Sequence, residues 1–280
     1  MKRDPARRFV ELMTALAVMS YCAATTLAHE QVLPKDVPAY MQAISVTIKA
    51  GFSEGSGVAI DRNGTTFVWT AGHVVDGLRS MRKVTDPKTG TPRTIIEFED
   101  ARIVKTLVEG GRTVGHLHLD AEVIRYSNAD HGHDLAILRV RKKGAIKTSA
   151  IFYDEEKPPK LGTQLFHVGS LLGQVGSNSM TTGIVSAHGR LIGKAIYDQT
   201  TVTAFPGSSG GGVYLTDGRY VGMLVRGAGE GFNFIVPVRR MRTWAKGAKM
   251  EWALDPRVKM PTDEEMKKLP IEDIGTDFGE

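Results

Sequence analysis

Short runs of β-branched and aromatic residues, separated by Gly, Asp, Asn and Pro, recur along the chain from Ile44 to Val236. Such runs are too short for typical helices, and their side chains favour extended backbone. Their number predicts an all-β protein with two barrels rather than one. The polar segment 142–160, which contains Pro158 and Pro159, is the predicted connection between the barrels.

After Pro237 the periodicity changes. Apolar residues recur every three or four positions with Arg and Lys between them, which predicts an amphipathic helix. The apolar positions are Val238, Met241, Ala245, Ala248 and Trp252. We expect this stripe to pack on the second barrel; the alternative is that the basic face binds a membrane or an acidic partner.

These patterns divide the chain into six parts. They are a signal peptide (1–28), an N-terminal segment (29–43), a first barrel (44–145), a second barrel (146–240), a C-terminal helix (241–254) and a flexible, charged tail (255–280).

The composition is that of an ordinary globular protein, with 41% apolar and 24% charged residues. The formal net charge is +5, and two of those charges belong to the predicted signal peptide. The remaining excess is small and scattered, which argues against nucleic acid as a partner.

The N-terminus predicts export to the periplasm or secretion. A basic stretch ends at Arg8, an apolar run covers 12–24, and small residues at 26–28 offer a cleavage site. The run is too short to span a bilayer comfortably. Because Asp4 and Glu11 are acidic where such signals usually are not, an uncleaved membrane anchor is the alternative.

The one cysteine, Cys22, lies within this segment, so the mature chain would contain no internal disulfide. The bulky Tyr21 before it argues against a lipoprotein. Stability is therefore expected to come from packing alone.

The segment Phe205-Pro206-Gly207-Ser208-Ser209-Gly210-Gly211-Gly212 is the strongest chemical signal. Acyl transfer needs a serine on a tight turn and two backbone N–H groups directed at the developing oxyanion. Ser209 is the candidate nucleophile, and the amides of Gly207 and Ser209 are the candidate oxyanion-hole donors, each typically worth about 3 kcal/mol. The alternative is a Gly/Ser loop without catalytic meaning.

A serine hydroxyl needs a base, and His73 is the candidate. It follows a β-run and the small residues Ala71 and Gly72, and it precedes Val74 and Val75. A strand followed by a small-residue turn is suited to carrying an imidazole into a cleft.

The base in turn needs a buried carboxylate. Asp134 directly precedes the apolar run 135–140, whereas the rivals Asp130 and Asp120 do not lead directly into a buried strand. The order His73, Asp134, Ser209 along the chain is that of chymotrypsin, not of subtilisin or the α/β-hydrolases.

With these motifs the chain resembles trypsin-like serine peptidases of the HtrA/Deg group. The matching segments are Gly55–Ile60, Thr70–Gly77, Asp134–Val140, Val168–Arg190 and Gln199–Gly212. The resemblance implies a chymotrypsin-like double six-stranded β-barrel with a C-terminal helix. It also implies an endopeptidase that cleaves unfolded or damaged polypeptides through an acyl-enzyme intermediate, without a cofactor.

Three departures qualify the resemblance. Too few residues follow Val236 for the PDZ domain common in that group, so regulation through PDZ domains is not expected. The stretch between the candidate His and Asp is long, which predicts extra hairpins around Gly90 and Gly110-Gly111. Phe205 and Gly212 stand where that group commonly has Asn and Pro.

Ser208 stands where digestive relatives have the Asp that pairs with a newly freed N-terminus. The chain also lacks an Ile-Val-Gly-Gly activation sequence. We therefore expect no activation by N-terminal cleavage.

The primary specificity pocket is predicted from positions near the nucleophile and from the strand that follows it. The predicted lining residues are Thr203, Ala204, Gly222, Met223, Leu224 and Arg226. None is acidic, which favours small to medium apolar side chains before the cleaved bond. Recruitment of an acidic side chain by Arg226 is the alternative.

The sequence leaves two other kinds of function open. A non-catalytic binding or chaperone module could use the same fold, although the presence of all three candidate residues argues against it. A metal site could use His116 with His118 or His131 with His133, but neither pair has an evident third ligand. We predict no metal. The natural substrate and the oligomeric state do not follow from the sequence.

Overall fold

The computed structural model describes residues 32–227 and 229–273. The predicted signal peptide, including Cys22, lies outside the described residues. Within them, no helix combines the length and apolar character needed to cross a membrane.

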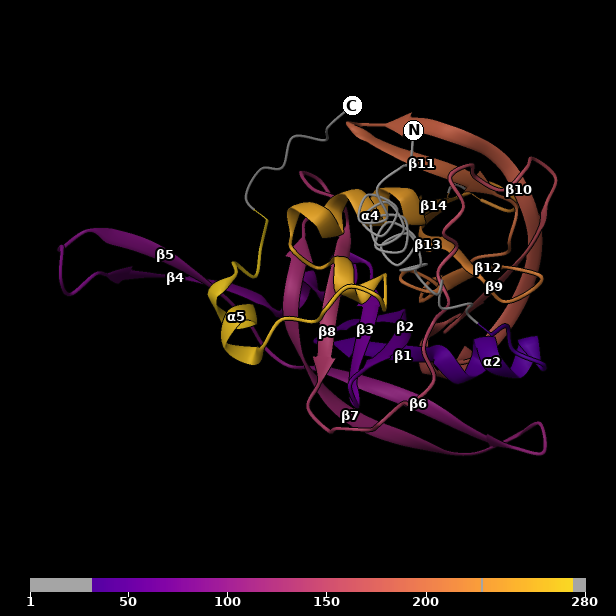
Figure 1. Ribbon diagram of the computed structural model, residues 1–280, viewed down its shortest axis with the longest axis horizontal. Helices are drawn as coiled ribbons and strands as arrows, with labels where there is room; N and C mark the ends of the chain where they lie inside the picture. The colour runs from indigo at the N-terminus through magenta and orange to yellow at the C-terminus, as the bar shows by residue number, and fades with distance from the viewer. Residues whose placement is uncertain (1–31, 228, 274–280) are drawn as a thin grey trace, which may run out of the picture. The chain divides into compact units, whose positions relative to one another are not determined.

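Twelve strands form two closed antiparallel barrels of six strands each (Figure 1). The first barrel runs in the order β1 (Ser45–Ala50), β2 (Ser53–Arg62), β3 (Thr65–Thr70), β8 (Leu135–Val140), β7 (Arg112–Ser127) and β6 (Ala101–Glu109). The second runs β10 (Ser179–Ile192), β11 (Ala195–Thr200), β14 (Asn233–Pro237), β13 (Tyr220–Gly227), β12 (Gly212–Leu215) and β9 (Gln164–Gly169). The prediction of an all-β double six-stranded barrel is confirmed.

Short helices connect or flank the strands. They are α2 (Val37–Ile44), α3 (Gly72–Val75), α4 (Val238–Gly247) and α5 (Asp263–Lys268), with 3₁₀ turns η1 (Asp76–Leu78), η2 (Gly173–Gly176) and η3 (Glu251–Ala253).

The apolar runs are strands whose side chains are buried in the barrels or under the segments that cover them. In β3, Phe67, Val68 and Trp69 are fully buried, and β3 pairs with β2 on one side and with β8 on the other. Because each barrel is closed, the backbone groups of its strands find partners on both sides. The first barrel thus holds β3 and β8 rigidly, and these are the strands that lead to His73 and follow Asp134.

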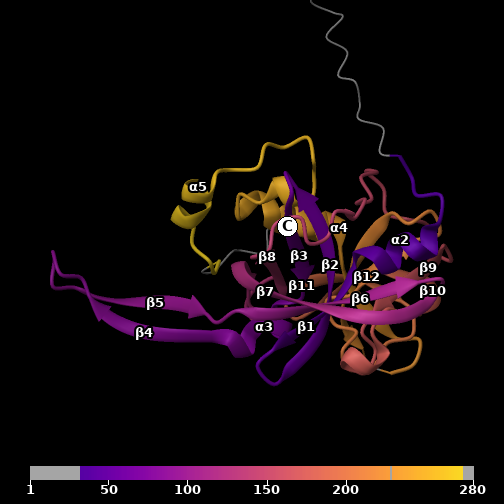
Figure 2. The ribbon, with the colours of Figure 1, turned by 90° about the horizontal axis from the view of Figure 1, so that it is seen from below.

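The two extra hairpins predicted between His73 and Asp134 are present. One turns through Gly110 and Gly111, both with positive φ, and joins β6 to β7. The other consists of β4 (Arg79–Thr85) and β5 (Pro92–Phe98) and forms a separate two-stranded sheet that turns near Gly90. We call residues 79–98 the arm; Figures 1 and 2 show it extending clear of the barrels.

The amphipathic helix is α4, and it begins directly after Pro237. As expected, α4 packs on the second barrel, where it contacts β13 and β14, and the apolar stripe also packs on the first barrel. Trp244 packs edge-on against Trp69 of the first barrel at 5.7 Å between ring centroids, and Trp252 packs against Phe67 at 4.7 Å. The helix directly follows β14 of the second barrel. Together with η3, it covers the face of β3 that carries Phe67 and Trp69.

The segment from 255 onward, for which the sequence predicted a flexible tail, contains ordered structure. Helix α5 begins with a capping box between Thr262 and Glu265. Residues 269–273, which we call the strap, then bond to β7: Tyr126 donates its N–H to the carbonyl of Ile271 (2.8 Å), and Asp273 donates its N–H to the carbonyl of Tyr126 (3.2 Å). The charged composition hid this element, because its bonds to β7 are made by the backbone and its ion pair depends on Arg79, which is distant in the chain.

Candidate active site

His73 is the second residue of α3, which follows β3 after a single residue. Gly72 is required just before it, because a Cβ there would lie 2.3 Å from the carbonyl oxygen of Ser127 and 3.2 Å from the amide of Leu135. The missing side chain lets α3 approach the loop that ends at Asp134. The imidazole remains partly open to solvent, with 37% of the side chain exposed.

Asp134 contacts His73 through three atom pairs. Nδ1 of the imidazole lies 3.0 Å from Oδ1 and 3.1 Å from Oδ2, and the backbone N–H of His73 donates to Oδ1 at 3.0 Å. The carboxylate therefore holds both the ring and the peptide of the histidine. Its side chain is only 1% exposed, so water does not compete for these contacts.

The charge on Asp134 is stabilised by these contacts. Burial would raise its pKa, but the hydrogen bonds and charge of His73, together with the charge of Arg226, hold the pKa below its ordinary value. Asp134 is therefore ionised at neutral pH, with an imidazole N–H as its main partner.

Asp134 has a left-handed backbone, with φ of +56°. Asp tolerates this region better than most residues, at a cost of about 1 kcal/mol or more. The loop before it is held by hydrogen bonds from the N–H of His133 to Oγ of Ser127 (2.6 Å) and from the N–H of Asp134 to the carbonyl of Asn128 (3.2 Å). Local strain maintained by surrounding bonds is common at functional sites.

The loop that carries Ser209 is fixed to the first barrel. The N–H of Ser56 in β2 donates to the carbonyl of Ser209 at 2.7 Å. A Cβ at Gly210 would lie 2.1 Å from the carbonyl oxygen of Ser56 and 3.1 Å from the amide of Ala71, two residues before His73. Gly55 of β2 lies between the helix that carries His73 and the loop that carries Ser209. A Cβ at Gly55 would be 2.6 Å from Val74 of α3 and 3.1 Å from the carbonyl oxygen of Ser209. Ser209 and α3 thus flank the same stretch of β2.

The two candidate oxyanion donors have free N–H groups. Among the hydrogen bonds of the described residues, neither the amide of Gly207 nor that of Ser209 has an acceptor. The carbonyl of Pro206 accepts from the N–H of Leu172 (2.7 Å), so in a trans peptide the N–H of Gly207 points away from that loop. Gly207 itself has φ of +93°, a conformation suited to glycine.

Comparison with known families identifies the architecture. The model of the trypsin-like peptidase domain matches residues 55–223, which include His73, Asp134 and Ser209. The chain belongs to the trypsin-like peptidase domain family.

Curated relatives of this trypsin-like peptidase domain include HtrA/Deg proteins. The Do-like serine protease HtrA of Lactobacillus helveticus is 29% identical over 178 residues, which cover 61% of this chain and 35% of the relative. A DegP-like periplasmic serine endoprotease of Halomonas elongata is 26% identical over 194 residues, covering 66% and 33% respectively. The chain thus spans about a third of the length of these curated relatives.

Among solved structures, Deg5 is similar with a TM-score of 0.53 and 20% sequence identity, covering 74% of this chain and 89% of Deg5. At this identity the likeness shows the shared fold alone.

A cavity of about 440 Å³ lies beside Ser209 in the trypsin-like domain. Of the predicted pocket residues, Ala204, Leu224 and Arg226 line it, while Thr203, Gly222 and Met223 do not. Met223 is fully buried in the core. The cavity also takes in Glu230, which the sequence analysis did not single out.

Ser56 is a further residue that sequence reasoning missed. Its Oγ donates to the carbonyl of Gly207 (2.7 Å) and accepts from the N–H of Ser170 (2.7 Å). Ser56 thus joins the nucleophile loop to the loop after β9. The available signal was its place between Gly55 and Gly57, which marks a strand approached closely by other backbone.

The four histidines that could bind a metal differ in solvent exposure. His116 and His118 are exposed on β7, whereas His131 is exposed and His133 is buried. In residues 32–227 and 229–273, no three His, Cys, Asp or Glu side chains are grouped so as to hold a metal ion.

Proposed function

We propose that this chain is a serine endopeptidase in which His73, Asp134 and Ser209 form the catalytic triad. The observation that carries the proposal is the contact between the buried Asp134 carboxylate and both Nδ1 and the backbone N–H of His73. Such a carboxylate fixes the tautomer that leaves Nε2 as a proton acceptor. The Ser209 loop, anchored on β2 beside α3, supplies the nucleophile.

In the proposed hydrolysis of a peptide bond, each of these groups has a defined role. Nε2 of His73 takes the proton of the Ser209 hydroxyl while Oγ bonds to the scissile carbonyl carbon. The amides of Gly207 and Ser209 stabilise the oxyanion. The imidazolium gives its proton to the leaving amine as the C–N bond breaks, which forms the acyl-enzyme. A water then gives a proton to the same nitrogen as its oxygen bonds to the acyl carbon, and the imidazolium returns that proton to Oγ as the C–Oγ bond breaks, which releases the acid and restores Ser209. No cofactor takes part in this scheme.

The proposed substrates are polypeptides, in particular unfolded or damaged proteins, and the proposed location is the periplasm or the cell exterior. A DegP-like relative named as a periplasmic serine endoprotease supports polypeptides as substrates and the periplasm as the location. Ala204 and Leu224 in the cavity support a preference for small to medium apolar side chains before the cleaved bond. Arg226 and Glu230 carry opposite charges at the same cavity, so neither an acidic nor a basic side chain has an unopposed partner there.

Reaction with a fluorophosphonate probe and cleavage of a peptide library test the proposal together. We expect the wild-type chain to become labelled on Ser209 and to cut peptides after apolar residues. The Ser209→Ala variant should do neither, with peptidase activity reduced on the order of 10⁶-fold. Ser208→Ala is the matched control, because it removes the adjacent hydroxyl and leaves Ser209 available for labelling.

A wild-type chain that neither reacts with the probe nor cuts peptides, yet binds unfolded polypeptide, would favour the non-catalytic binding or chaperone module. Labelling at a residue other than Ser209 would remove Ser209 from the triad.

A further inference from the structure

Helix α4 carries a buried arginine, Arg240, that bonds to the residue before Asp134. Arg240 is 8% exposed, and its Nη2 donates to the carbonyl oxygen of His133 at 2.8 Å. Its Nη1 donates to the carbonyl oxygen of Ile196 in β11 at 3.3 Å. One guanidinium therefore ties a strand of the second barrel to the peptide that directly precedes Asp134.

A second arginine holds the same loop from another strand. Arg226 of β13 donates from Nη2 to the carbonyl oxygen of Ala129 at 3.0 Å. Both guanidinium groups lie at the ring of Tyr197, with Cζ to ring-centroid distances of 4.6 Å for Arg240 and 5.6 Å for Arg226. Tyr197 thus orients two cations that bind the 127–134 loop at different points.

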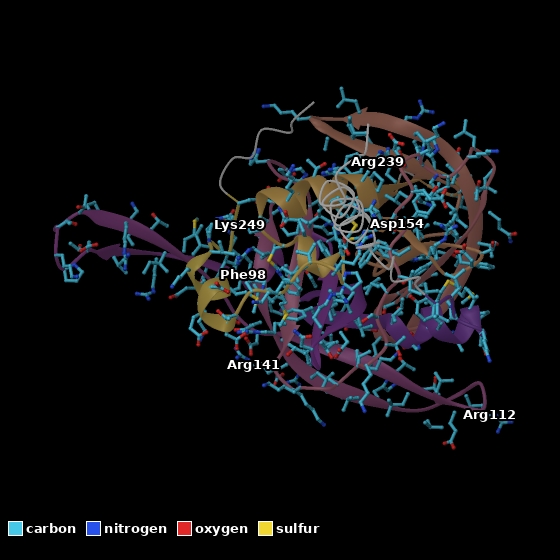
Figure 3. The ribbon with its side chains drawn as sticks, in the orientation of Figure 1. Phe98, Arg112, Arg141, Asp154, Arg239 and Lys249 are labelled. Carbon is cyan, nitrogen blue, oxygen red and sulfur yellow. The ribbon has the colours of Figure 1, made fainter. Side chains whose placement is uncertain are left out.

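The charge of Arg240 has no direct ionic partner in the described part of the chain. Its neighbour Arg239, labelled in Figure 3, instead pairs with Asp198 at 2.5 Å. Burial lowers the pKa of Arg240, and the influences that oppose this come from Tyr197 and from the Asp134 carboxylate. A buried cation held by carbonyl groups rather than by a carboxylate is costly, so Arg240 adds little to general stability.

The loop itself explains that role. Asp134 has a strained left-handed backbone. The other hydrogen bonds described above for this loop, which the N–H groups of His133 and Asp134 donate to Ser127 and Asn128, lie within the loop. Those local bonds set the loop's shape but do not set its position relative to the second barrel, which carries Ser209. The arginine bonds come from that second barrel and its helix.

We propose that Arg240 is a positioning residue for the triad, which, together with Arg226 on the Tyr197 ring, fixes the Asp134 loop against the barrel that carries the nucleophile. This inference rests on the proposed peptidase function. Arg240 touches neither Ser209 nor the substrate cavity, so it acts through the position of Asp134. A displacement of about 1 Å in a catalytic group can cost on the order of 100-fold in rate.

The variant Arg240→Lys tests the role while keeping the positive charge. A lysine cannot bond to the carbonyls of His133 and Ile196 together through a rigid fork. We expect kcat to fall roughly 10- to 100-fold and KM to change by less than about threefold. We also expect the acidic limb of the kcat/KM profile to move to lower pH, because a displaced carboxylate stabilises the imidazolium less. The charged or titratable groups that act on Asp134 are His73 from α3, Arg226 from β13 and Arg240 from α4.

Arg239→Lys is the matched control, because it changes the neighbouring residue of the same helix and touches Asp198 instead of the loop. It should leave kcat and the pH profile unchanged. Arg240→Met removes the charge as well, and its kcat should be at least as low as that of Arg240→Lys. If Arg240→Met does not fold, Arg240→Lys decides, with assays run well below its measured melting temperature.

Wild-type kcat and an unmoved pH profile in folded Arg240→Lys would overturn the inference while leaving the peptidase intact. A rise in KM alone would overturn it too, because that would place Arg240 in substrate binding. Failure of the proposed function would look different, since the wild-type chain would then neither cut peptide nor react with the fluorophosphonate.

Discussion

At the scale of single residues, burial separates side chains of the same type into different roles. Asp130 is exposed, and Asp120 is exposed and lies 3.6 Å from Arg102. Asp134 is buried and contacts His73. The sequence favoured Asp134 because an apolar run follows it, and a residue at the start of a buried strand is drawn toward the core. The sequence did not show that His73 is its partner, because His73 lies in α3, 61 residues earlier in the chain.

His167 gives a test of burial through pH. It is fully buried in β9, Nδ1 lies 3.0 Å from the carbonyl oxygen of Gly212, and burial lowers its pKa from 6.5 to about 4. As pH falls below 6.5, His167 becomes protonated in the unfolded chain, whereas in the folded chain it stays neutral until about pH 4. Stability present above pH 6.5 is therefore lost across this window, by on the order of 3 kcal/mol. Denaturant unfolding at pH 7 and pH 4.5 measures the loss.

The His167→Gln variant should show a smaller difference in unfolding free energy between those two pH values than the wild type. His131→Gln, at an exposed histidine, should keep the wild-type difference. An equal pH dependence in His167→Gln and wild type would show that His167 does not titrate in this window.

At the scale of elements, the arm and the strap differ in how they are held. The strands of the arm pair only with each other, and exposed side chains such as Met81 and the Arg82–Glu97 ion pair cover them. Its base is tied down, because Phe98, labelled in Figure 3, packs against Tyr126 at 5.0 Å. Arg79 pairs with Glu272 of the strap at 2.6 Å, so the base and the strap support each other.

Shortening the arm should therefore leave the barrels stable. Replacing residues 82–95 with an Asn-Gly turn removes the outer part of the arm, whose strands pair with each other and not with the barrels. We expect the melting temperature to stay within about 2 °C of wild type. Arg79→Ala, at the base, should lower it more, because it leaves the partly buried Glu272 unpaired. The reverse order in thermal unfolding would show that the distal arm is packed on the barrels.

At the scale of the whole molecule, aromatic side chains join the C-terminal segment to the first barrel. Trp69 contacts both Phe152 of the connection and Trp244 of α4, and its Nε1 donates to the carbonyl of Ala253 at 3.2 Å. Residues far apart in the chain thus share one core, which also includes residues of both barrels. We expect the barrels and the C-terminal segment to unfold together.

The variant Trp252→Ala tests this coupling. Trp252 is 1% exposed and packs edge-on against Phe67, so truncation should cost about 3 to 5 kcal/mol. If the core is shared, calorimetry should show one transition at a lower temperature. Two separated transitions, with one at the wild-type temperature, would mean that the second barrel is stable without this contact.

The sequence predicted what depends on local patterns. Alternating short runs and turn residues indicated the barrels, paired glycines at 110 and 111 marked a hairpin, and the spacing after Pro237 indicated the helix. It also placed His73, Asp134 and Ser209 at the ends of strands or on tight turns, where side chains reach a cleft. These features follow from backbone propensity and from which face each residue presents.

Tertiary structure decided everything that depends on which distant groups meet. It brought the carboxylate of Asp134 to His73, sent the stripe of α4 to the first barrel, and turned Met223 inward while leaving Leu224 at the cavity. It also bound Arg240 to the peptide before Asp134. Local sequence does not encode these contacts, because each depends on the closure of two barrels whose strands are distant along the chain.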